Sequence, residues 1–245
     1  MGAVPLLPDQ VERARPAPTD GPVRRTPWPH EAEGLPEMTR SPVSTRRSVL
    51  GAAGVLGAML LFAVTVGAAI HTSGTTFVWS VNMISDLGDG ACRPRDGRWI
   101  CSPGSAAFNV GLLLTGVLLG VAALCLTARW GRWLAGSVAV MGLGLVVAAV
   151  FPAGDTGAVH LAGVILALVV PAGGLLLSAV RPETSWLRRG RRTRGTLATV
   201  ALIFCAENRI PPALVQEGTG QIIIVSCLLL ALLVESVRVL ATRSG

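Results

Sequence analysis

The sequence lacks tyrosine and lysine and is poor in aromatic and charged residues. Of its 245 residues, 4% are aromatic and 14% are charged, and all 21 basic residues are arginine. In a soluble domain about a quarter of the residues are charged, which is well above the fraction in this chain. In addition, 51% of the residues are hydrophobic and the mean hydropathy is +0.59. Small residues of the kind that dominate here allow membrane helices to pack closely. The composition therefore predicts a membrane protein.

Two further absences narrow the function. The chain has none of the motifs GxSxG, Walker A, HExxH or CxxC, so we expect no cofactor. The sequence pI is near 10.7, but the arginines lie in short stretches between apolar runs rather than in one basic patch. Such stretches are typical of cytoplasmic loops between membrane spans, and we therefore expect no nucleic-acid partner.

Six apolar runs follow one another along the chain. They are about Ser48–Ile70, Ser105–Thr127, Leu134–Val150, Ala158–Val180, Thr196–Ala206 and Gly220–Leu240. A membrane helix needs about 20 residues, and the fifth run is short. The runs predict an all-α, polytopic bundle of six transmembrane helices over residues 48–240, followed by a short tail at 241–245.

The segment before the first run has a different character. Residues 1–47 hold many prolines and several charges without apolar periodicity, so we predict that they are disordered. The stretch "MTRSPVSTRRSVL" from Met38 resembles an ordinary bacterial membrane-protein start. Met38 is therefore an alternative start of the chain.

Arginines also predict the orientation. They gather in the amino-terminal segment, in the second and fourth loops and at the carboxyl end, whereas the third loop, "PAGDTGA", has none. The positive-inside rule then places both termini in the cytoplasm, in a multi-pass protein of the bacterial plasma membrane. The first outer loop has three arginines and three aspartates that balance them: Arg93, Arg95, Arg98, Asp86, Asp89 and Asp96.

Two cysteines lie in that first outer loop. Cys92 and Cys101 flank the segment "RPRDGRWI". Disulfides persist outside the cytoplasm, so we predict a bond between them, with two unrelated thiols as the alternative.

Polar side chains collect near the outer ends of the predicted spans. Glu207 lies about 12 residues, or about 18 Å, along the fifth helix. A charge at that depth costs about 2.5–3.5 kcal/mol unless it is paired or hydrated, and Pro211 and Pro212 then break the helix. We infer an outward-facing polar pocket, whose candidate residues are Asn82, Ser85, Asp86, Asn109, His160, Glu207 and Arg209.

Within that pocket, Asp86 is predicted to pair with Arg209. An arginine at membrane depth needs a carboxylate, and its planar guanidinium suits one held by two hydrogen bonds. Glu207 is two residues from Arg209, so on one helix it would point to a different face. Asp86 is then the expected counter-ion.

The main functional hypothesis is a non-enzymatic membrane protein that binds a lipid headgroup or a small polar ligand, with membrane lipids as partners. One alternative is a membrane-embedded metal-dependent hydrolase with His71, Asp86 and His160 as metal ligands. Another is an ion- or proton-coupled transporter with Asp86 and Glu207 as the relay.

Three segments resemble one known family. "NMISDLG", then "FNVGLLLTGVLLG" and "VFPAGDTGAVHLAG", resemble the DUF998 family of six-span bacterial membrane proteins, over about Ser48–Leu240. That family tends to have a Glu-Arg pair near the outer end of the fifth span, whereas Asn208 separates the two residues here. The family has no assigned biochemical function. The resemblance therefore implies the fold, the topology and the site residues, but no reaction.

Overall fold

The computed structural model describes residues 42–154, 157–207 and 214–242, and these form an α-helical unit. The helices are α1 (Pro42–Ser73), α2 (Ser105–Val150), α3 (Gly157–Val164), α4 (Val170–Val180), α5 (Ser185–Arg189), α6 (Arg191–Glu207) and α7 (Glu217–Ala241). A π-helical turn, η3 (Ile165–Val169), joins α3 to α4. Two 3-10 turns, η1 (Gly74–Thr76) and η2 (Ile84–Gly88), and two short strands, β1 (Arg93–Arg95) and β2 (Arg98–Ile100), connect α1 to α2. The predicted all-α class is confirmed.

Helix α2 contains two antiparallel arms. Gly131 has φ +66° and ψ 178°, a conformation that essentially only glycine adopts. A Cβ atom at Gly116 would lie 2.5 Å from the carbonyl oxygen of Gly142, whereas a straight helix would separate these residues by about 39 Å. The chain therefore reverses at Gly131, and residues 105–130 pack against residues 132–150.

Four helical segments are long and apolar enough to cross a membrane. Among the described residues they are Thr45–Ser73, Ser105–Val150, Gly157–Val180 and Glu217–Ala241. Large apolar side chains on their outer surfaces face away from the bundle; Leu60, for example, is 67% exposed and Val121 is 56% exposed. Lipid is the solvent that suits such a surface, so the chain is a multi-pass membrane protein.

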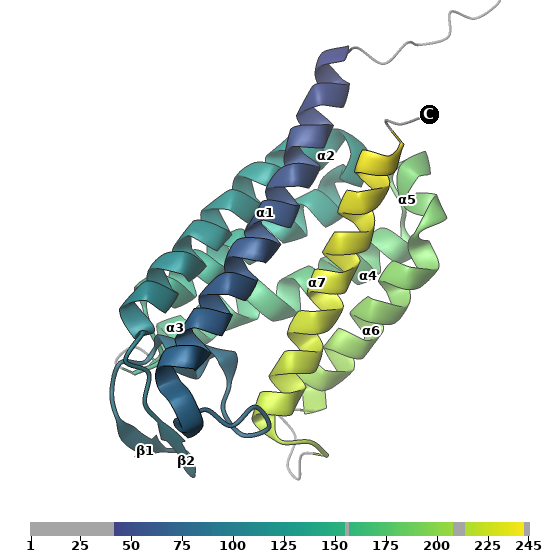
Figure 1. Cartoon of the computed structure of the whole chain (residues 1–245). Coiled ribbons are helices and arrows are strands. Elements are labelled where there is room, and N and C mark those ends of the chain that lie inside the picture. Colours follow the sequence, from purple (N-terminus) through teal and green to yellow (C-terminus); the bar gives the residue numbers. More distant parts are fainter. Residues whose placement is uncertain (1–41, 155–156, 208–213, 243–245) are drawn as a thin grey trace, which may run out of the picture. The chain divides into compact units, whose positions relative to one another are not determined.

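The bundle is held together by close contacts between small residues. Helix α1 packs along α2, and α7 lies beside α1 and α6 (Figure 1). A Cβ atom at Gly163 in α3 would lie 2.8 Å from the backbone nitrogen of Ala148 and 3.1 Å from the carbonyl oxygen of Gly144, both in α2. Because no side chain separates the two backbones, dispersion contacts between the helices are extensive.

The first helix begins earlier than the sequence predicts. Residues 42–47 belong to α1, although the expected disordered segment reaches residue 47. Proline favours the first turn of a helix, and Pro42 begins this one. The side chain of Arg47 donates a hydrogen bond to the carbonyl oxygen of Leu124 at 3.3 Å. Residues 1–41, with Met38, lie outside the described residues.

A buried ion pair joins α4, α6 and α7. Nη1 of Arg194 is 2.6 Å from Oε1 of Glu235, and each side chain is 1% exposed. Nε of Arg194 also donates to Oγ of Ser178 at 3.1 Å. Nη1 of Arg238 reaches Oε2 of Glu235 at 2.8 Å. Arg194 precedes the predicted fifth run, which begins at Thr196, but it lies in α6, where a buried charge needs such partners.

Candidate functional site

Side chains hold the loop from Val78 to Gly88 in place. Oδ1 of Asn82 accepts a hydrogen bond from the backbone N–H of Val78 at 2.9 Å, and its Nδ2 donates to the carbonyl oxygen of Trp99 at 3.0 Å. Oδ2 of Asp86 accepts from the N–H of Met83 at 2.9 Å. Backbone N–H and C=O groups outside helices and strands need such hydrogen-bond partners where water is scarce. These hydrogen bonds therefore fix the conformation of the loop, although it contains no long helix.

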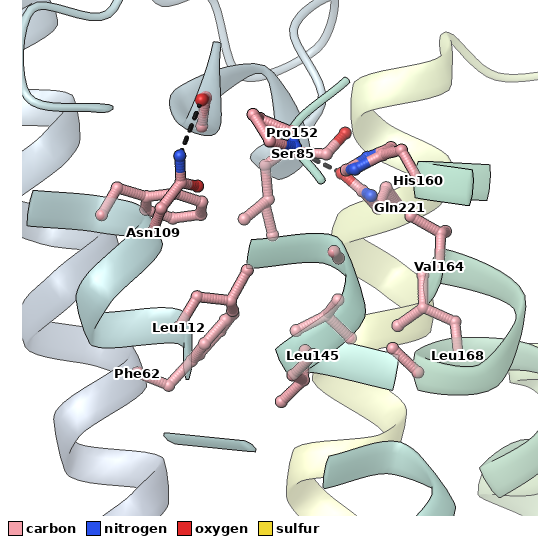
Figure 2. A pocket seen from close by; sticks show the side chains of 16 residues that line it. Phe62, Ser85, Asn109, Leu112, Leu145, Pro152, His160, Val164, Leu168 and Gln221 are labelled. Carbon is pink, nitrogen blue, oxygen red and sulfur yellow. Dashed lines mark hydrogen bonds between the residues drawn. The ribbon is translucent and has the colours of Figure 1, made fainter. Parts of the chain in front are cut away.

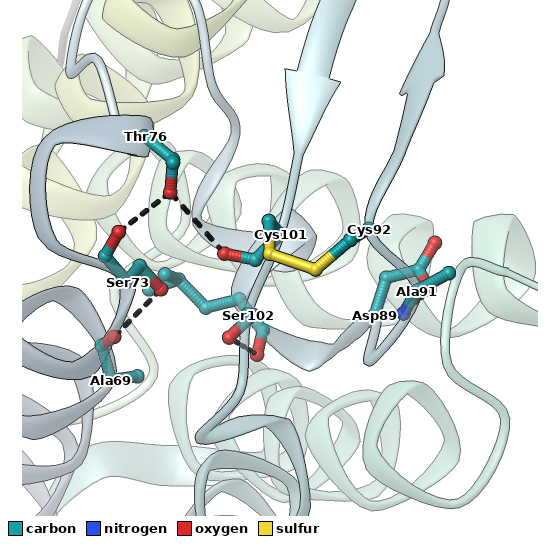
Figure 3. Close-up of a disulfide and its surroundings, with 9 residues drawn as sticks. Ala69, Ser73, Thr76, Asp89, Ala91, Cys92, Cys101 and Ser102 are labelled. Carbon is teal, nitrogen blue, oxygen red and sulfur yellow. Dashed lines mark hydrogen bonds between the residues drawn. A yellow bond between two sulfur atoms is a disulfide. The ribbon is translucent and has the colours of Figure 1, made fainter.

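Strands β1 and β2 form a hairpin that a disulfide closes at its base. Cys92 and Cys101 are bonded, which confirms the prediction from the sequence (Figure 3). The strands pair antiparallel, with Arg93 opposite Ile100 and Arg95 opposite Arg98. After the hairpin, Oγ of Ser102 donates to the carbonyl oxygen of Leu87 at 2.8 Å. The hairpin is thus anchored beside η2.

The hairpin places Arg98 against Asp86. Nε of Arg98 is 2.8 Å from Oδ2 of Asp86, and Nη2 is 3.4 Å from Oδ1. Nη1 of Arg98 reaches Oε2 of Glu217, at the start of α7, at 2.9 Å. Burial lowers the pKa of Arg98, but the hydrogen bond and charge of Asp86 outweigh it and raise that pKa above its ordinary value. The arginine is therefore a permanent cation neutralised by two carboxylates.

Arg98 is a partner of Asp86 that the sequence did not predict. The sequence analysis paired Asp86 with Arg209, and Arg209 lies outside the described residues. In the structure Asp86 is 3% exposed, and Arg98 contacts both of its carboxylate oxygens. Asp86 is thus a buried partner of an arginine from its own loop. The aspartates of that loop do balance its arginines, since Asp89 also lies 3.3 Å from Nη2 of Arg93.

Two cavities meet beneath the hairpin. The larger has a volume of about 240 Å³ and includes the polar side chains of Ser85, Asp86, Arg95, Arg98, His160 and Gln221 in its lining. The smaller, of about 60 Å³, extends between the helices, where its lining is largely apolar. Four residues line both cavities: Ser85, His160, Val164 and Gln221. Figure 2 shows Ser85, His160 and Gln221 near one end of the smaller cavity and Phe62, Leu145 and Leu168 toward the other.

A comparison with protein families matched residues 55–235 to the family described as "Protein of unknown function (DUF998)". The chain belongs to the DUF998 family. The matched segment includes every residue that lines the two cavities. No curated protein and no solved structure matched the chain.

His160 of this DUF998 protein has one ring nitrogen without a hydrogen-bond partner in the described part of the chain. Nδ1 is 2.9 Å from the carbonyl oxygen of Phe151. A carbonyl can only accept a hydrogen bond, so in the neutral ring Nδ1 carries the proton and Nε2 presents a lone pair. Nε2 is buried and has no hydrogen-bond partner among the described residues. His160 therefore places at the meeting point of the two cavities an acceptor that no described residue uses.

Gln221 is a site residue that the sequence analysis missed. Its Oε1 accepts the N–H of Ile84 at 2.5 Å, which leaves the amide nitrogen at the cavity. The available signal was a single amide near the start of an apolar run, one turn after Glu217. Arg98 was missed as well, because the sequence alone showed it only as one of several arginines in an outer loop.

The structure brings together only some of the residues that the sequence predicted to line an outward-facing pocket. Ser85, Asp86 and His160 line the larger cavity, and Asn109 lines the smaller one, where its Nδ2 donates to the carbonyl oxygen of Gly88 at 3.0 Å. Asn82 instead supports the loop. Glu207, at the end of α6, accepts hydrogen bonds from the backbone N–H groups of Leu214 and Val215.

The residues of the hydrolase alternative are not assembled into a metal site in the described part of the chain. Across the described ranges, no three His, Cys, Asp or Glu side chains lie close enough to hold a metal ion. His71 is at the end of α1, and Asp86 is bound to Arg98. The residues proposed for a hydrolase therefore do not fit a metal. The two acids proposed as a transport relay, Asp86 and Glu207, each accept hydrogen bonds from nearby backbone N–H groups.

Proposed function

We propose that this DUF998 protein binds an amphiphilic lipid, with the polar headgroup in the larger cavity beneath the hairpin and an apolar portion directed toward the smaller one. The observation that carries the proposal is the shared lining, because a single ligand at Ser85, His160 and Gln221 would contact both a polar and an apolar chamber. Binding pockets commonly combine apolar walls with a few converging polar groups.

The polar groups that remain available define the headgroup. Arg98 is already neutralised by Asp86 and Glu217, so no anionic group of the ligand is needed to neutralise it. Nε2 of His160 favours a ligand hydroxyl or ammonium donor, whereas the hydroxyl of Ser85 and the amide of Gln221 can donate to an ester or phosphate oxygen. A phospholipid or glycolipid headgroup carries both kinds of group, and we favour it over a small soluble ligand.

The same proposal includes six membrane crossings and cytoplasmic termini. The reversal at Gly131 supports two crossings within α2, and α6 supports one more beyond the other three apolar segments. The arginine-rich segments then alternate with the arginine-poor third loop, as the positive-inside rule requires. The cavities would open on the outer side of the bacterial plasma membrane.

Native mass spectrometry of the full chain, purified in mild detergent, tests lipid binding. We expect one lipid per chain, released at lower collision energy from Ser85→Ala than from the unchanged protein. The Ser85 hydroxyl holds no other described residue, so this change leaves the fold intact. His71→Ala is the matched control for His160→Ala, since His71 does not line either cavity.

The outcomes separate the alternatives. Lipid retention lowered by Ser85→Ala and His160→Ala, and unchanged by His71→Ala, supports the proposal. Absence of bound lipid, or equal retention in all variants, overturns it. A bound polar metabolite in place of a lipid would overturn the lipid assignment and identify the larger cavity as a small-molecule site.

A further inference from the structure

A basic hollow lies at the other end of the bundle from the hairpin, where α4 leads through α5 into α6 (Figure 1). Its volume is about 560 Å³. Seven residues line it: Arg132, Trp133, Arg181, Pro182, Glu183, Arg188 and Arg191. None of them lines the two cavities beneath the hairpin, so this hollow is independent of the proposed lipid site there.

Only one of the four arginines has a carboxylate partner within the described part of the chain. Nε of Arg132 is 2.6 Å from Oε1 of Glu183, whose Oε2 also accepts the N–H of Arg132 at 2.6 Å. Glu183 therefore neutralises Arg132 and caps the second arm of α2. The side chains of Arg181, Arg188 and Arg191 form no ion pair or hydrogen bond with any described residue. Three positive charges thus remain around one hollow.

The hollow lies at the level where apolar helix surface ends. Arg181 directly follows Val180, the last residue of an apolar segment, and Val180 is 69% exposed. At the start of the second arm of α2, the guanidinium of Arg132 stacks on the ring of Trp133, 5.1 Å from the ring centre. Tryptophan and arginine are typical of the zone where lipid headgroups meet water. A phosphate of the adjacent leaflet would lie at this depth.

We propose that this hollow binds the phosphate of an anionic phospholipid headgroup. Guanidinium groups recognise phosphate through paired hydrogen bonds, and basic pockets between membrane helices bind anionic headgroups. Three arginines without an ion-pair partner among the described residues line it: Arg181 directly after α4, Arg188 in α5 and Arg191 at the start of α6. A headgroup bound between them would join these elements to the Gly131 turn. The chemistry is that of any phosphate anion, so the experiment has to separate the lipid from free phosphate.

Adjacent arginines provide a matched control. Arg188→Gln with Arg191→Gln removes two charges from the hollow, whereas Arg189→Gln with Arg192→Gln removes two charges from exposed neighbours that do not line it. The thermal unfolding of the full chain in uncharged detergent is measured against increasing short-chain phosphatidylglycerol. A ligand that binds the folded state raises the unfolding temperature.

We expect phosphatidylglycerol to stabilise the unchanged protein and the control equally. The hollow variant should bind it about thirtyfold more weakly, because each of its two lost arginines contributes about fivefold. Arg181→Gln alone, a milder change, should weaken binding about fivefold. Phosphatidylcholine with the same acyl chains should give no specific shift, and added salt should weaken the effect of phosphatidylglycerol.

Three results would overturn the proposal. The first is an unfolding temperature of the unchanged protein that phosphatidylglycerol does not raise. Equal weakening in the hollow variant and the control would show that only net charge matters, as expected for arginines that merely orient the chain. Stabilisation by inorganic phosphate at the concentrations at which phosphatidylglycerol acts would identify a free-anion site and overturn the lipid assignment. The comparison of the hollow variant with its control is independent of Ser85 and His160, because no residue of the hollow lines the two cavities beneath the hairpin. The proposed function is therefore decided by its own test.

Discussion

Nε of Arg98 on strand β2 lies 2.8 Å from Oδ2 of Asp86 in η2, and their side chains are 5% and 3% exposed. This pair joins the disulfide-closed hairpin to the loop that lines the larger cavity. Glu217 adds the start of α7 to the same arginine. Three segments that form one wall of the cavity therefore meet at a single guanidinium.

Removing either partner of this pair should destabilise the protein strongly. Asp86→Asn and Arg98→Gln each leave a buried charge without its main partner, and such changes cost about 3–5 kcal/mol. The double variant should recover part of the summed loss, because neither charge is then left alone. Unfolding in detergent, followed by circular dichroism, measures the cycle.

Asp96→Asn is the control for that cycle. Asp96 is exposed and lies in the hairpin turn at φ +48°, a conformation that asparagine tolerates. The free energy of unfolding of the Asp96→Asn variant should differ from that of the unchanged protein by less than about 0.5 kcal/mol. Strictly additive losses from Asp86→Asn and Arg98→Gln would contradict the coupling.

Loss of the disulfide should also destabilise the folded state. Cys92 and Cys101 are nine residues apart, and closing a loop of that length in the unfolded chain contributes about 2–3 kcal/mol. Cys92→Ser with Cys101→Ser should lower the unfolding temperature, and a reductant should lower that of the unchanged protein to the same value. Cys125→Ala, at a free cysteine, should leave the response to reductant intact. Five reactive thiols in the denatured, unreduced chain would exclude the bond.

The turn within α2 should not tolerate a side chain. Gly131→Ala places an L residue in a region that costs about 1–3 kcal/mol, and its Cβ would lie 2.5 Å from Oε2 of Glu183. We expect a loss of about 2 kcal/mol or more in denaturant unfolding. Gly120→Ala is the control, since a Cβ there meets no atom within 4 Å and alanine favours a helix. Equal stability of the two variants would contradict a glycine-dependent reversal.

Much of the helical architecture could be predicted because it depends on local pattern. The apolar runs Ser105–Thr127 and Leu134–Val150 correspond to the two arms of α2, and the run Gly220–Leu240 corresponds to α7. The disulfide could be predicted because both cysteines lie in one short loop. The π-helical turn Ile165–Val169 could not, since nothing in its apolar residues differs from an ordinary helix.

The candidate site was only partly predictable. Ser85, Asp86 and His160 stood out because polar residues are rare beside apolar runs, and all three line the larger cavity. The buried pair of Arg194 and Glu235 was not predicted. Arginines are expected in cytoplasmic loops, so the composition of the segment hid the fact that one of them turns into the bundle.

The sequence by itself determined the membrane class, the apolar helices and the break between the runs Ser105–Thr127 and Leu134–Val150, because the length of an apolar run depends only on neighbouring residues. Only the tertiary structure decided which polar groups meet. Gln221 accepts the N–H of Ile84 across 137 residues, and Arg98 reaches Glu217 across 119. Such partners depend on the direction in which each side chain leaves its folded segment, and that direction follows from the packing of the whole bundle.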